Sequence, residues 1–264
     1  MAEVTARGIR FHIQRLGAGD RTVVFLHGLV MDNLSSWYFS VATPVATQSE
    51  VLLYDLRGHG RSERTPTGYR LDDMVADLDG VLEAAGLASR RVTLVGNSFG
   101  GLLALAFAVA RPSRVDGLVL VDAHLSDAGW AARMQETLRL QGAERDLMIA
   151  RSFKDWLGRH SERKRNRLAE HAKALVYETS LVEDLGATPS FGDADLRSIA
   201  CPTLALYGET SDIRDHGERI AATLPSCELR IYPGCTHSIL WEATARLRDD
   251  VLAWLAAPSP AGAD

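Results

Sequence analysis

Short apolar runs recur along the chain between polar or glycine-containing stretches, and they predict its architecture. Most hold four or five residues rich in Val, Leu or Tyr. Such runs are typical of strands buried on both faces of a parallel sheet. The predicted strands of this kind lie at 22–26, 51–54, 92–95, 118–121, 203–207 and 228–232. Residues 9–13 alternate between apolar and polar positions, which predicts a half-buried edge strand.

Helical spacing of apolar residues appears between these runs. It predicts one helix over 71–82, a short buried helix at 102–110 and a closing amphipathic helix at 240–255. Strands that alternate with helices imply right-handed crossovers. We therefore expect an α/β protein whose sheet is covered by helices on both faces.

Between about 125 and 195 the alternation of strands and helices stops, because no convincing strand occurs there. Trp130, Met134 and Leu138 recur every four residues, and apolar positions at helical spacing continue to Val176. We predict a helical cap at 125–195, inserted into a core formed by 1–124 and 196–256. Residues 257–264 are rich in Pro, Ala and Gly and are expected to form a disordered tail.

Composition and charge exclude several classes of protein. The chain of 264 residues carries 29 basic and 34 acidic residues, so its net charge is −5 and nucleic acid is an improbable partner. The longest apolar stretch is far shorter than the roughly 20 residues that span a bilayer. The first residues lack a signal-peptide pattern, so we expect a cytoplasmic protein that does not bind membranes.

Neither the cysteines nor any other cluster indicates a cofactor. Cys201, Cys227 and Cys235 are odd in number and lack metal-ligand spacing, so we interpret them as reduced packing residues. No metal cluster or phosphate-binding loop is present, and the basic run at 163–167 is interpreted as a solvated helix face. We expect no metal and no cofactor.

The strongest chemical signal is the sequence G-N-S-F-G-G at 96–101. It follows a predicted strand and precedes a predicted helix, the setting that the G-x-S-x-G motif requires. A sharp turn there would project the Ser98 hydroxyl at the positive end of the helix. The alternative is a tight turn that happens to contain serine. We predict that Ser98 is a nucleophile.

A serine nucleophile needs a base, and the base needs an orienting carboxylate. Of the eight histidines, His237 is the predicted base, because it follows the last strand at the edge where the carboxyl ends of parallel strands meet. Asp212 is the preferred acid. Asp122, which ends the strand at 118–121, and Glu209 remain alternatives.

A third loop, beginning at His27-Gly28, follows the strand at 22–26. It can supply one backbone N–H to an oxyanion, and the amide of Phe99 can supply the second. We interpret His27 as a structural hydrogen-bonding residue, because a role as base would duplicate that of His237.

Taken together, these motifs resemble the α/β-hydrolase superfamily, in order, from about residue 8 to 256. The matching segments are His27-Gly28, D-L-R-G-H-G-R-S at 55–62, the turn at 96–101, P-T-L at 202–204, and Thr236-His237 with Glu242. The resemblance implies an α/β-hydrolase fold, with an eight-stranded, mostly parallel sheet and a helical cap after the sixth strand. It implies Ser98 as nucleophile, Asp212 as acid, His237 as base, and the amides of Leu29 and Phe99 as the oxyanion hole.

Two positions depart from the family pattern. Asn97 stands where histidine is frequent, and the interval from Gly208 to Asp212 is one residue longer than usual. The longer interval keeps Asp122 open, since some relatives place the acid after that earlier strand. The loop at 31–37 more weakly resembles hydrolases of bacterial natural-product pathways.

The resemblance and Ser98 together predict a serine hydrolase that cleaves a carboxylic ester, lactone or thioester through an acyl-enzyme. Alternatives on the same residues are C–C bond hydrolysis, cofactor-free perhydrolysis and, least favoured, a non-catalytic ligand receptor. The expected partner is a small apolar acyl substrate, with a carrier-protein-bound acyl group as a further candidate. Five residues are predicted to line its pocket: Trp37, Trp130, Met134, Phe153 and Trp156.

Overall fold

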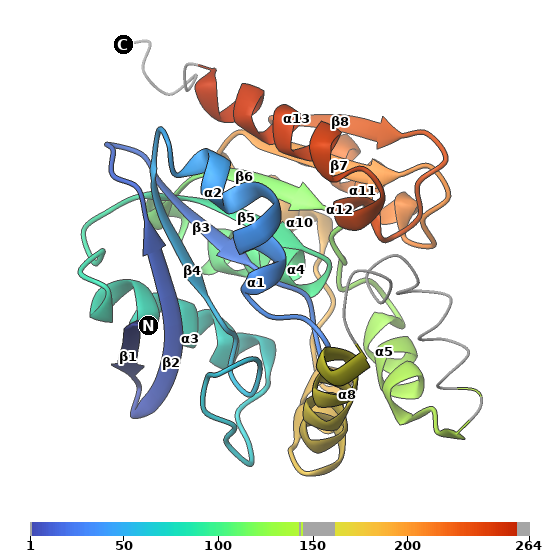
Figure 1. Ribbon diagram of the computed structural model, residues 1–264. Coiled ribbons are helices and arrows are strands. Elements are labelled where there is room, and N and C mark those ends of the chain that lie inside the picture. Colours follow the sequence, from blue (N-terminus) through green and yellow to red (C-terminus); the bar gives the residue numbers. More distant parts are fainter. Residues whose placement is uncertain (1, 143, 145–161, 258–264) are drawn as a thin grey trace.

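A single eight-stranded sheet runs through the protein (Figure 1). The computed structural model describes residues 2–142, 144 and 162–257. The strand order is β1-β2-β4-β3-β5-β6-β7-β8; β1 and β2 pair antiparallel with their neighbours, and all other pairs are parallel. The strands are β1 (Ala2–Ala6), β2 (Ile9–Leu16), β3 (Thr22–Leu26), β4 (Glu50–Tyr54), β5 (Val92–Asn97), β6 (Val115–Val121), β7 (Thr203–Gly208) and β8 (Cys227–Tyr232). The predicted mostly parallel sheet is confirmed.

The first strand was not among the segments identified from apolar runs. β1 is short and mostly exposed, so it carries no run of buried residues. Arg7 and Gly8 both adopt a positive φ between β1 and β2, and this tight turn folds the two strands into a hairpin at the sheet edge.

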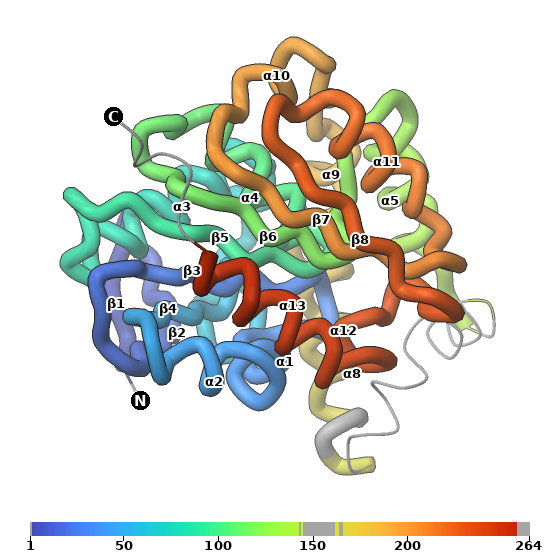
Figure 2. Tube along the Cα trace, turned by 90° about the horizontal axis from the view of Figure 1, so that it is seen from above, coloured from blue at the N-terminus to red at the C-terminus, as the bar shows by residue number. Residues whose placement is uncertain are grey.

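Helices cover both faces of the sheet, as Figure 2 shows from above. Alternate residues of the strands point to opposite faces: Val24 and Leu26 join one apolar cluster, whereas Val23 and Phe25 join the other. The first cluster includes α3 (Leu71–Ala84), α4 (Phe99–Ala110) and Ile220 of α11 (Arg214–Thr223). The second includes residues of α1 (Ser35–Trp37), the π-helix η1 (Tyr38–Ala42), α2 (Thr43–Val45), α12 (Ile239–Glu242) and α13 (Thr244–Ala256).

The closing helix differs from its predicted form. Instead of one helix over 240–255 there are two, α12 and α13, separated at Ala243. Ala243 has φ −127° and ψ 34°, outside the helical region, so the hydrogen-bonding pattern restarts there. The side chain of Glu242 accepts hydrogen bonds from the amide and hydroxyl of Thr236, which holds the end of α12 against the preceding loop.

Only helices lie between β6 and β7 among the described residues of that segment. They are α5 (Trp130–Arg139), α8 (Glu162–Tyr177), α9 (Leu181–Gly186) and α10 (Asp193–Arg197). Their place matches the expected cap, and we propose the boundaries 125–195 for it. Phe153, Trp156 and residues 258–264 of the tail predicted at 257–264 lie outside the described residues. Within the described ranges, no helix has the length and apolar character that a membrane span requires.

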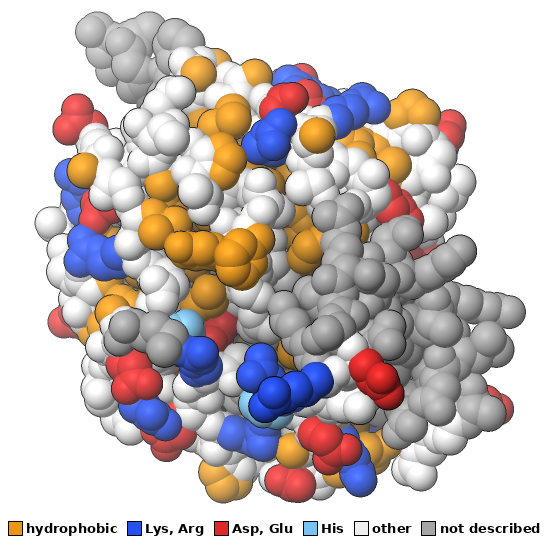
Figure 3. All heavy atoms as spheres, in the orientation of Figure 1, with side chains coloured by type: hydrophobic (Ala, Val, Ile, Leu, Met, Phe, Trp, Pro, Cys, Tyr) orange, Lys and Arg blue, Asp and Glu red, His pale blue; other side chains and the backbone are white. Residues whose placement is uncertain are grey.

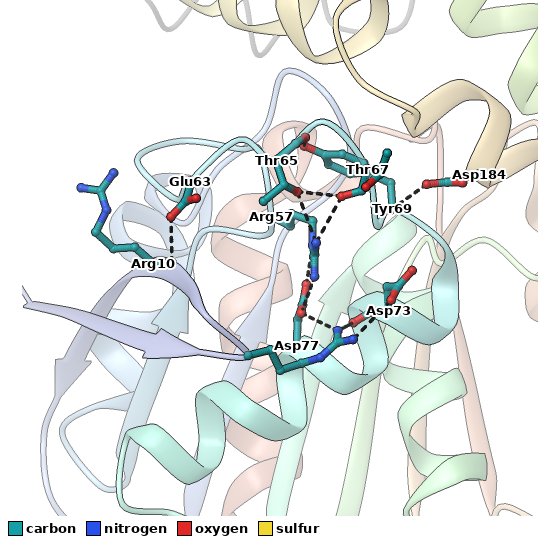
Figure 4. Close-up of polar contacts among 10 residues, drawn as sticks. Arg10, Arg57, Glu63, Thr65, Thr67, Tyr69, Asp73, Asp77 and Asp184 are labelled. Atoms are coloured by element: carbon teal, nitrogen blue, oxygen red, sulfur yellow. Dashed lines mark hydrogen bonds and ion pairs between the residues drawn. The ribbon is translucent and has the colours of Figure 1, made fainter.

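A buried ion pair connects the loop after β4 to α3 (Figure 4). Asp77 accepts hydrogen bonds from Arg57 Nε and Nη2 at 2.8 and 2.7 Å, and both side chains are almost fully buried. Arg7 donates a further bond to Asp77 at 2.8 Å. Beyond this pair, the amide of Tyr69 donates to Asp184 of α9, which ties the same loop to the helical insertion.

We expect Asp77→Asn to destabilise the fold by about 3 kcal/mol, because removing one partner leaves the buried Arg57 guanidinium without a counter-charge. Asp73→Asn is the matched control on the same helix: Asp73 also pairs with Arg7 but is 30% exposed, so its loss should cost about 1 kcal/mol or less. Urea unfolding monitored by circular dichroism measures both values. Equal losses would contradict the role assigned to burial.

Candidate active site

Ser98 lies at the sharp turn between β5 and α4, partly exposed. Its backbone adopts φ 54° and ψ −118°, a conformation that costs a non-glycine residue free energy and that clusters at functional sites. The Ser98 carbonyl accepts hydrogen bonds from the amides of Gly101 and His124, so the surrounding structure holds the turn in place. The predicted strand–turn–helix setting of Ser98 is present.

The glycines of the motif are required by close backbone approaches. A Cβ at Gly96 would lie 2.3 Å from the carbonyl oxygen of Gly100, and a Cβ at Gly100 would lie 2.3 Å from that of Leu26. Backbone atoms cannot retreat from such contacts, so any side chain would displace the turn. The glycine spacing in the sequence therefore records how tightly the turn packs against β3.

His237 brings its imidazole to Ser98 from the loop after β8. The Ser98 hydroxyl lies 3.1 Å from His237 Nε2, and His237 Nδ1 lies 2.9 Å from Asp122 Oδ1. A carboxylate can only accept, so Nδ1 carries the proton and Nε2 is left to accept from the serine. Three side chains from the ends of three strands thus form one hydrogen-bonded chain.

Asp122 is held rigidly at the end of β6. It is fully buried and adopts φ 43°, while its amide donates to the Leu206 carbonyl at 2.7 Å. Its Oδ2 accepts from the amide of Gly208 at 2.7 Å, and its Oδ1 accepts from the Ser211 hydroxyl at 2.5 Å as well as from His237. These donors satisfy the buried carboxylate and fix its orientation.

The acid preferred from the sequence, Asp212, does not contact the imidazole. Asp212 is exposed and forms no hydrogen bond with His237, whose Nδ1 is already occupied by Asp122. The loop after β7 instead uses Ser211 to bind Asp122. The alternative Glu209 accepts from the amide of Gly234 and is likewise not at the imidazole. The structure thus brings the alternative acid Asp122, and not the preferred Asp212, into contact with the imidazole.

The surroundings of His237 favour its charged form. Burial lowers the pKa of the imidazole, but the hydrogen bond to Asp122 and the negative charges of Asp122, Asp212 and Glu242 outweigh it. The pKa of His237 therefore lies above its ordinary value near 6.5. Asp212 thus acts on the imidazole through its charge, although it does not touch it.

A base must be neutral to accept a proton, so this raised pKa predicts the direction of the pH profile. We expect kcat/KM to be lost as the pH falls through the raised pKa of His237 and to level off above it. Initial rates measured between about pH 5 and pH 9 give the profile. A flat profile with the chemical step rate-limiting would count against His237 as base.

The loop after β3 carries a backbone amide near the nucleophile that is not used by the described residues. A Cβ at Gly28 would lie 3.5 Å from Ser98 Cβ, so the loop passes close to the serine. The amides of Gly28 and Val30 donate to Asp32 and His59, whereas that of Leu29 donates to none of the described residues. The Phe99 amide, at the first position of α4, is also unused within that part of the chain. Both predicted oxyanion donors are thus available.

Two buried histidines hold this loop. The Leu56 amide donates to His27 Nε2 at 2.9 Å, so His27 Nδ1 bears the proton and donates to the Gly28 carbonyl at 2.7 Å. His59 accepts from the Val30 amide, and burial, helped by the nearby His27, lowers its pKa to about 3. His27 has the structural role expected for it.

The predicted pocket residues separate into three groups. Trp37 is not a pocket residue: it is fully buried in the core, packs against Phe25 and donates from Nε1 to the Leu26 carbonyl at 2.9 Å. Trp130 of α5 is itself buried in the other cluster, with its ring 5.8 Å from that of His124, and Met134 of the same helix packs against this cluster partly buried. Phe153 and Trp156 lie outside the described residues.

A cluster of histidines beside His237 was not anticipated. His124 lies with its ring 5.4 Å from that of His237 and 5.8 Å from Trp130, and His216 follows at 6.1 Å. Burial, and then the nearby His237 and His216, hold the pKa of His124 well below its ordinary value, so this ring is neutral. The sequence contained one signal for His124: it lies two residues after Asp122, at the end of a predicted strand.

No group of metal-ligating side chains occurs among the described residues, and all three cysteines are free. The side chains that hydrogen bonds bring together are those of Ser98, His237 and Asp122. In general, a serine, a base, a carboxylate and nearby backbone amides can perform acyl transfer.

Comparison with known proteins agrees with this architecture. A 2-hydroxy-6-oxononadienedioate/2-hydroxy-6-oxononatrienedioate hydrolase of Paraburkholderia phymatum is 31% identical, over 94% of this chain and 91% of that protein. A 2-hydroxy-6-oxo-2,4-heptadienoate hydrolase of Pseudomonas putida is 30% identical, over 95% of each. The crystal structure of the enol-lactonase from Burkholderia xenovorans LB400 shares the fold, with a TM-score of 0.77, 20% identity, and coverage of 97% of this chain and all of that one.

The family model for the alpha/beta hydrolase family matches residues 23–250, which include all three strand ends that carry Ser98, Asp122 and His237. The match spans most of the sheet and the whole helical insertion. The two relatives named above are both hydrolases. The chain belongs to the alpha/beta hydrolase family.

Proposed function

We propose that this enzyme is a serine hydrolase in which Ser98, His237 and Asp122 form the catalytic triad. The observation that carries the proposal is the continuous chain of contacts from the Ser98 hydroxyl through both imidazole nitrogens to Asp122, at 3.1 and 2.9 Å. The strained backbone of Ser98 supports it, because such strain persists where a side chain must be presented for chemistry.

In the proposed reaction His237 Nε2 takes the proton of the Ser98 hydroxyl as its oxygen attacks the substrate carbonyl. Asp122 stabilises the imidazolium, and the amides of Leu29 and Phe99 stabilise the oxyanion. Collapse of the tetrahedral intermediate breaks the bond to the leaving group, which receives the proton from His237. A water molecule, deprotonated by His237, then hydrolyses the acyl-enzyme and restores Ser98.

The substrate proposed first is a small molecule with an apolar acyl group joined as a carboxylic ester, lactone or thioester. Met134 of α5 supports an apolar acyl side, since it is only partly buried and packs against the apolar cluster that contains the buried Trp130. His124 adds one neutral polar ring beside His237. A few polar groups in an apolar wall are typical of sites for small ligands.

A second candidate is hydrolysis of a C–C bond next to a ketone, and the named relatives favour it. A 2-hydroxy-6-oxo dienoate contains a ketone and one or two carboxylates but no ester, so its hydrolase must break a C–C bond. The same triad can perform this reaction, with His237 supplying the proton that the carbon leaving group needs. Sequence identities near 30% to these relatives support the same class of reaction, but they do not specify the same substrate.

A substrate panel separates these candidates. Purified enzyme is tested on p-nitrophenyl esters, lactones, acyl thioesters and a 2-hydroxy-6-oxo dienoate, with Ser98→Ala as the control for background hydrolysis. We expect turnover of one class that Ser98→Ala lacks, and labelling of Ser98 by an alkylphosphonate. Failure of the phosphonate to label Ser98 would overturn the proposal and favour a ligand receptor.

A further inference from the structure

The loop after β7 contacts both the acid and the loop that carries the base. Its Ser211 hydroxyl donates to Asp122. One residue earlier, the amide and the hydroxyl of Thr210 both donate to the carbonyl of Cys235, each at 2.9 Å. Cys235 lies two residues before His237 in the chain. The same short loop therefore fixes the position of Ser211 relative to the acid and to the base.

The Ser211 hydroxyl has a defined direction. Its oxygen lies 2.5 Å from Asp122 Oδ1, and a carboxylate can only accept, so the hydroxyl donates to the acid. The amide of Ile213 donates to the same hydroxyl oxygen, over 3.3 Å, and the Ile213 side chain is buried. Hydrogen bonds in a chain polarise one another, so the bond from Ile213 strengthens the contact between Ser211 and Asp122.

Two donors share one oxygen of the acid. Asp122 Oδ1 accepts from Ser211 at 2.5 Å and from His237 Nδ1 at 2.9 Å, whereas the Gly208 amide occupies Oδ2. Each donor draws negative charge toward itself, so two donors on one atom weaken each other. The hydroxyl also directs the positive end of its dipole at the oxygen that Nδ1 contacts. Both effects oppose a positive charge on the imidazole.

The other groups that face His237 act on it without touching the acid. Asp212, in the loop after β7, and Glu242, in α12, are negative and favour the protonated imidazole. His124, after β6, has its ring 5.4 Å from that of His237 and is neutral. Ser211 differs from these neighbours because it is uncharged and acts through a hydrogen bond to Asp122.

The groups beside the acid are neutral, and the exposed charges are mixed in sign. Burial is the main cause that raises the pKa of the Tyr207 hydroxyl and of the Cys235 thiol, and the charge of Asp122 adds to both shifts. On the face shown in Figure 3, acidic and basic side chains lie interspersed. Salt screens such exposed charges beyond about 10 Å. The protonation of His237 therefore depends mainly on the groups next to it.

We propose that Ser211 is a positioning residue of the triad: its hydroxyl holds Asp122 Oδ1 toward His237 and limits how strongly the acid stabilises the imidazolium. The inference rests on the function proposed above, because it assigns a role within that triad. Ser211 and Asp212 then act on the imidazole in opposite directions. The hydroxyl keeps more of the imidazole neutral and able to accept a proton, whereas the charge of Asp212 favours the protonated form.

The test follows the pKa of His237 directly. The imidazole is titrated by NMR in protein labelled with ¹³C at histidine, and its signal is assigned by its loss in His237→Gln. Ser211→Ala should raise this pKa by about half a pH unit to one unit, because a donor that competes for the acid is gone. The acid limb of kcat/KM should move up equally, so the rate below that limb should fall about three- to tenfold. Ser211→Gly removes the same hydroxyl if the alanine variant does not fold.

Three further variants serve as controls. Ser211→Thr keeps a hydroxyl, so it should leave the pKa of His237 within about 0.2 pH unit of the parent value. Thr210→Val removes the neighbouring hydroxyl, which donates to the Cys235 carbonyl and not to the acid, and it should also leave that pKa unchanged. Asp212→Asn should lower the pKa, since it removes a negative charge near the imidazole.

An unchanged pKa of His237 in Ser211→Ala would overturn the proposal. A lower pKa would overturn it as well, because the hydroxyl would then serve only to hold the acid against the imidazole. Neither result depends on turnover, since the titration is performed on the folded protein without substrate. Failure of the proposed hydrolase reaction is recognised separately, by the substrate panel and by phosphonate labelling of Ser98.

Discussion

Asp122→Asn is expected to lower kcat by about 10⁴-fold while the protein stays folded. The Gly208 amide donates to Asp122 Oδ2, so an asparagine must turn its oxygen toward Gly208. Its NH₂ group then faces His237 Nδ1 in place of Oδ1. That group donates to Nδ1, which forces the proton onto Nε2, and the imidazole can no longer accept from Ser98. Steady-state kinetics with the best substrate of the panel measures the loss.

Asp212→Asn is the matched control for this prediction. Asp212 is exposed and acts on His237 only through its charge, so its loss should change kcat less than about fivefold and lower the kinetic pKa. Circular dichroism confirms folding of both variants. A severe loss in Asp212→Asn beside a mild one in Asp122→Asn would return the acid to the loop after β7.

Ser98→Ala should reduce kcat by about 10³-fold or more, because the reaction proceeds through the serine oxygen. The stability of the fold should change little. Among the described side chains, the Ser98 hydroxyl has one hydrogen-bond partner, His237, and the turn is held by backbone hydrogen bonds to the Ser98 carbonyl.

Activity at the same level in Ser98→Ala would rule out nucleophilic catalysis by this residue. Loss of activity together with loss of the unfolding transition would mean that the substitution damaged the turn. Ser98→Cys then provides a second variant, since it keeps a nucleophile of similar size on the same backbone.

The sheet and the serine turn could be predicted because their signals are local in the sequence. Apolar runs mark β3 to β8, and the glycines around Ser98 mark a turn whose backbone contacts leave no room for a Cβ. The hairpin strand β1 escaped notice, since its residues are mostly exposed. The break at Ala243 lies in one residue whose backbone leaves the helical region, and the spacing of apolar residues does not indicate it.

The acid could not be assigned from the sequence, because Asp122 and Asp212 both follow strands at the same edge of the sheet. The choice depends on the path of five residues after β7, where Ser211 and not Asp212 turns inward. The hydrogen bond between His12 and Asp55 could not be predicted either, because the two residues lie 43 positions apart in the sequence. Trp37 was predicted to line the pocket but is buried in the core against Phe25, because an aromatic residue near an active-site loop can serve either role.

The position of Asp122 also bears on how freely the loop after β7 can change in length. Asp122 is fixed by the sheet, through the Leu206 carbonyl, and by Gly208 and Ser211. Residues inserted between Asp212 and Arg214 would make no contact with Asp122 itself, but Ile213 is buried there and its amide donates to the Ser211 hydroxyl. Doubling the length of a flexible loop costs only about 0.6 kcal/mol of closure entropy. Insertions that keep Ile213 buried and bonded to Ser211 can therefore reshape the rim of the site while the distance between acid and base stays the same.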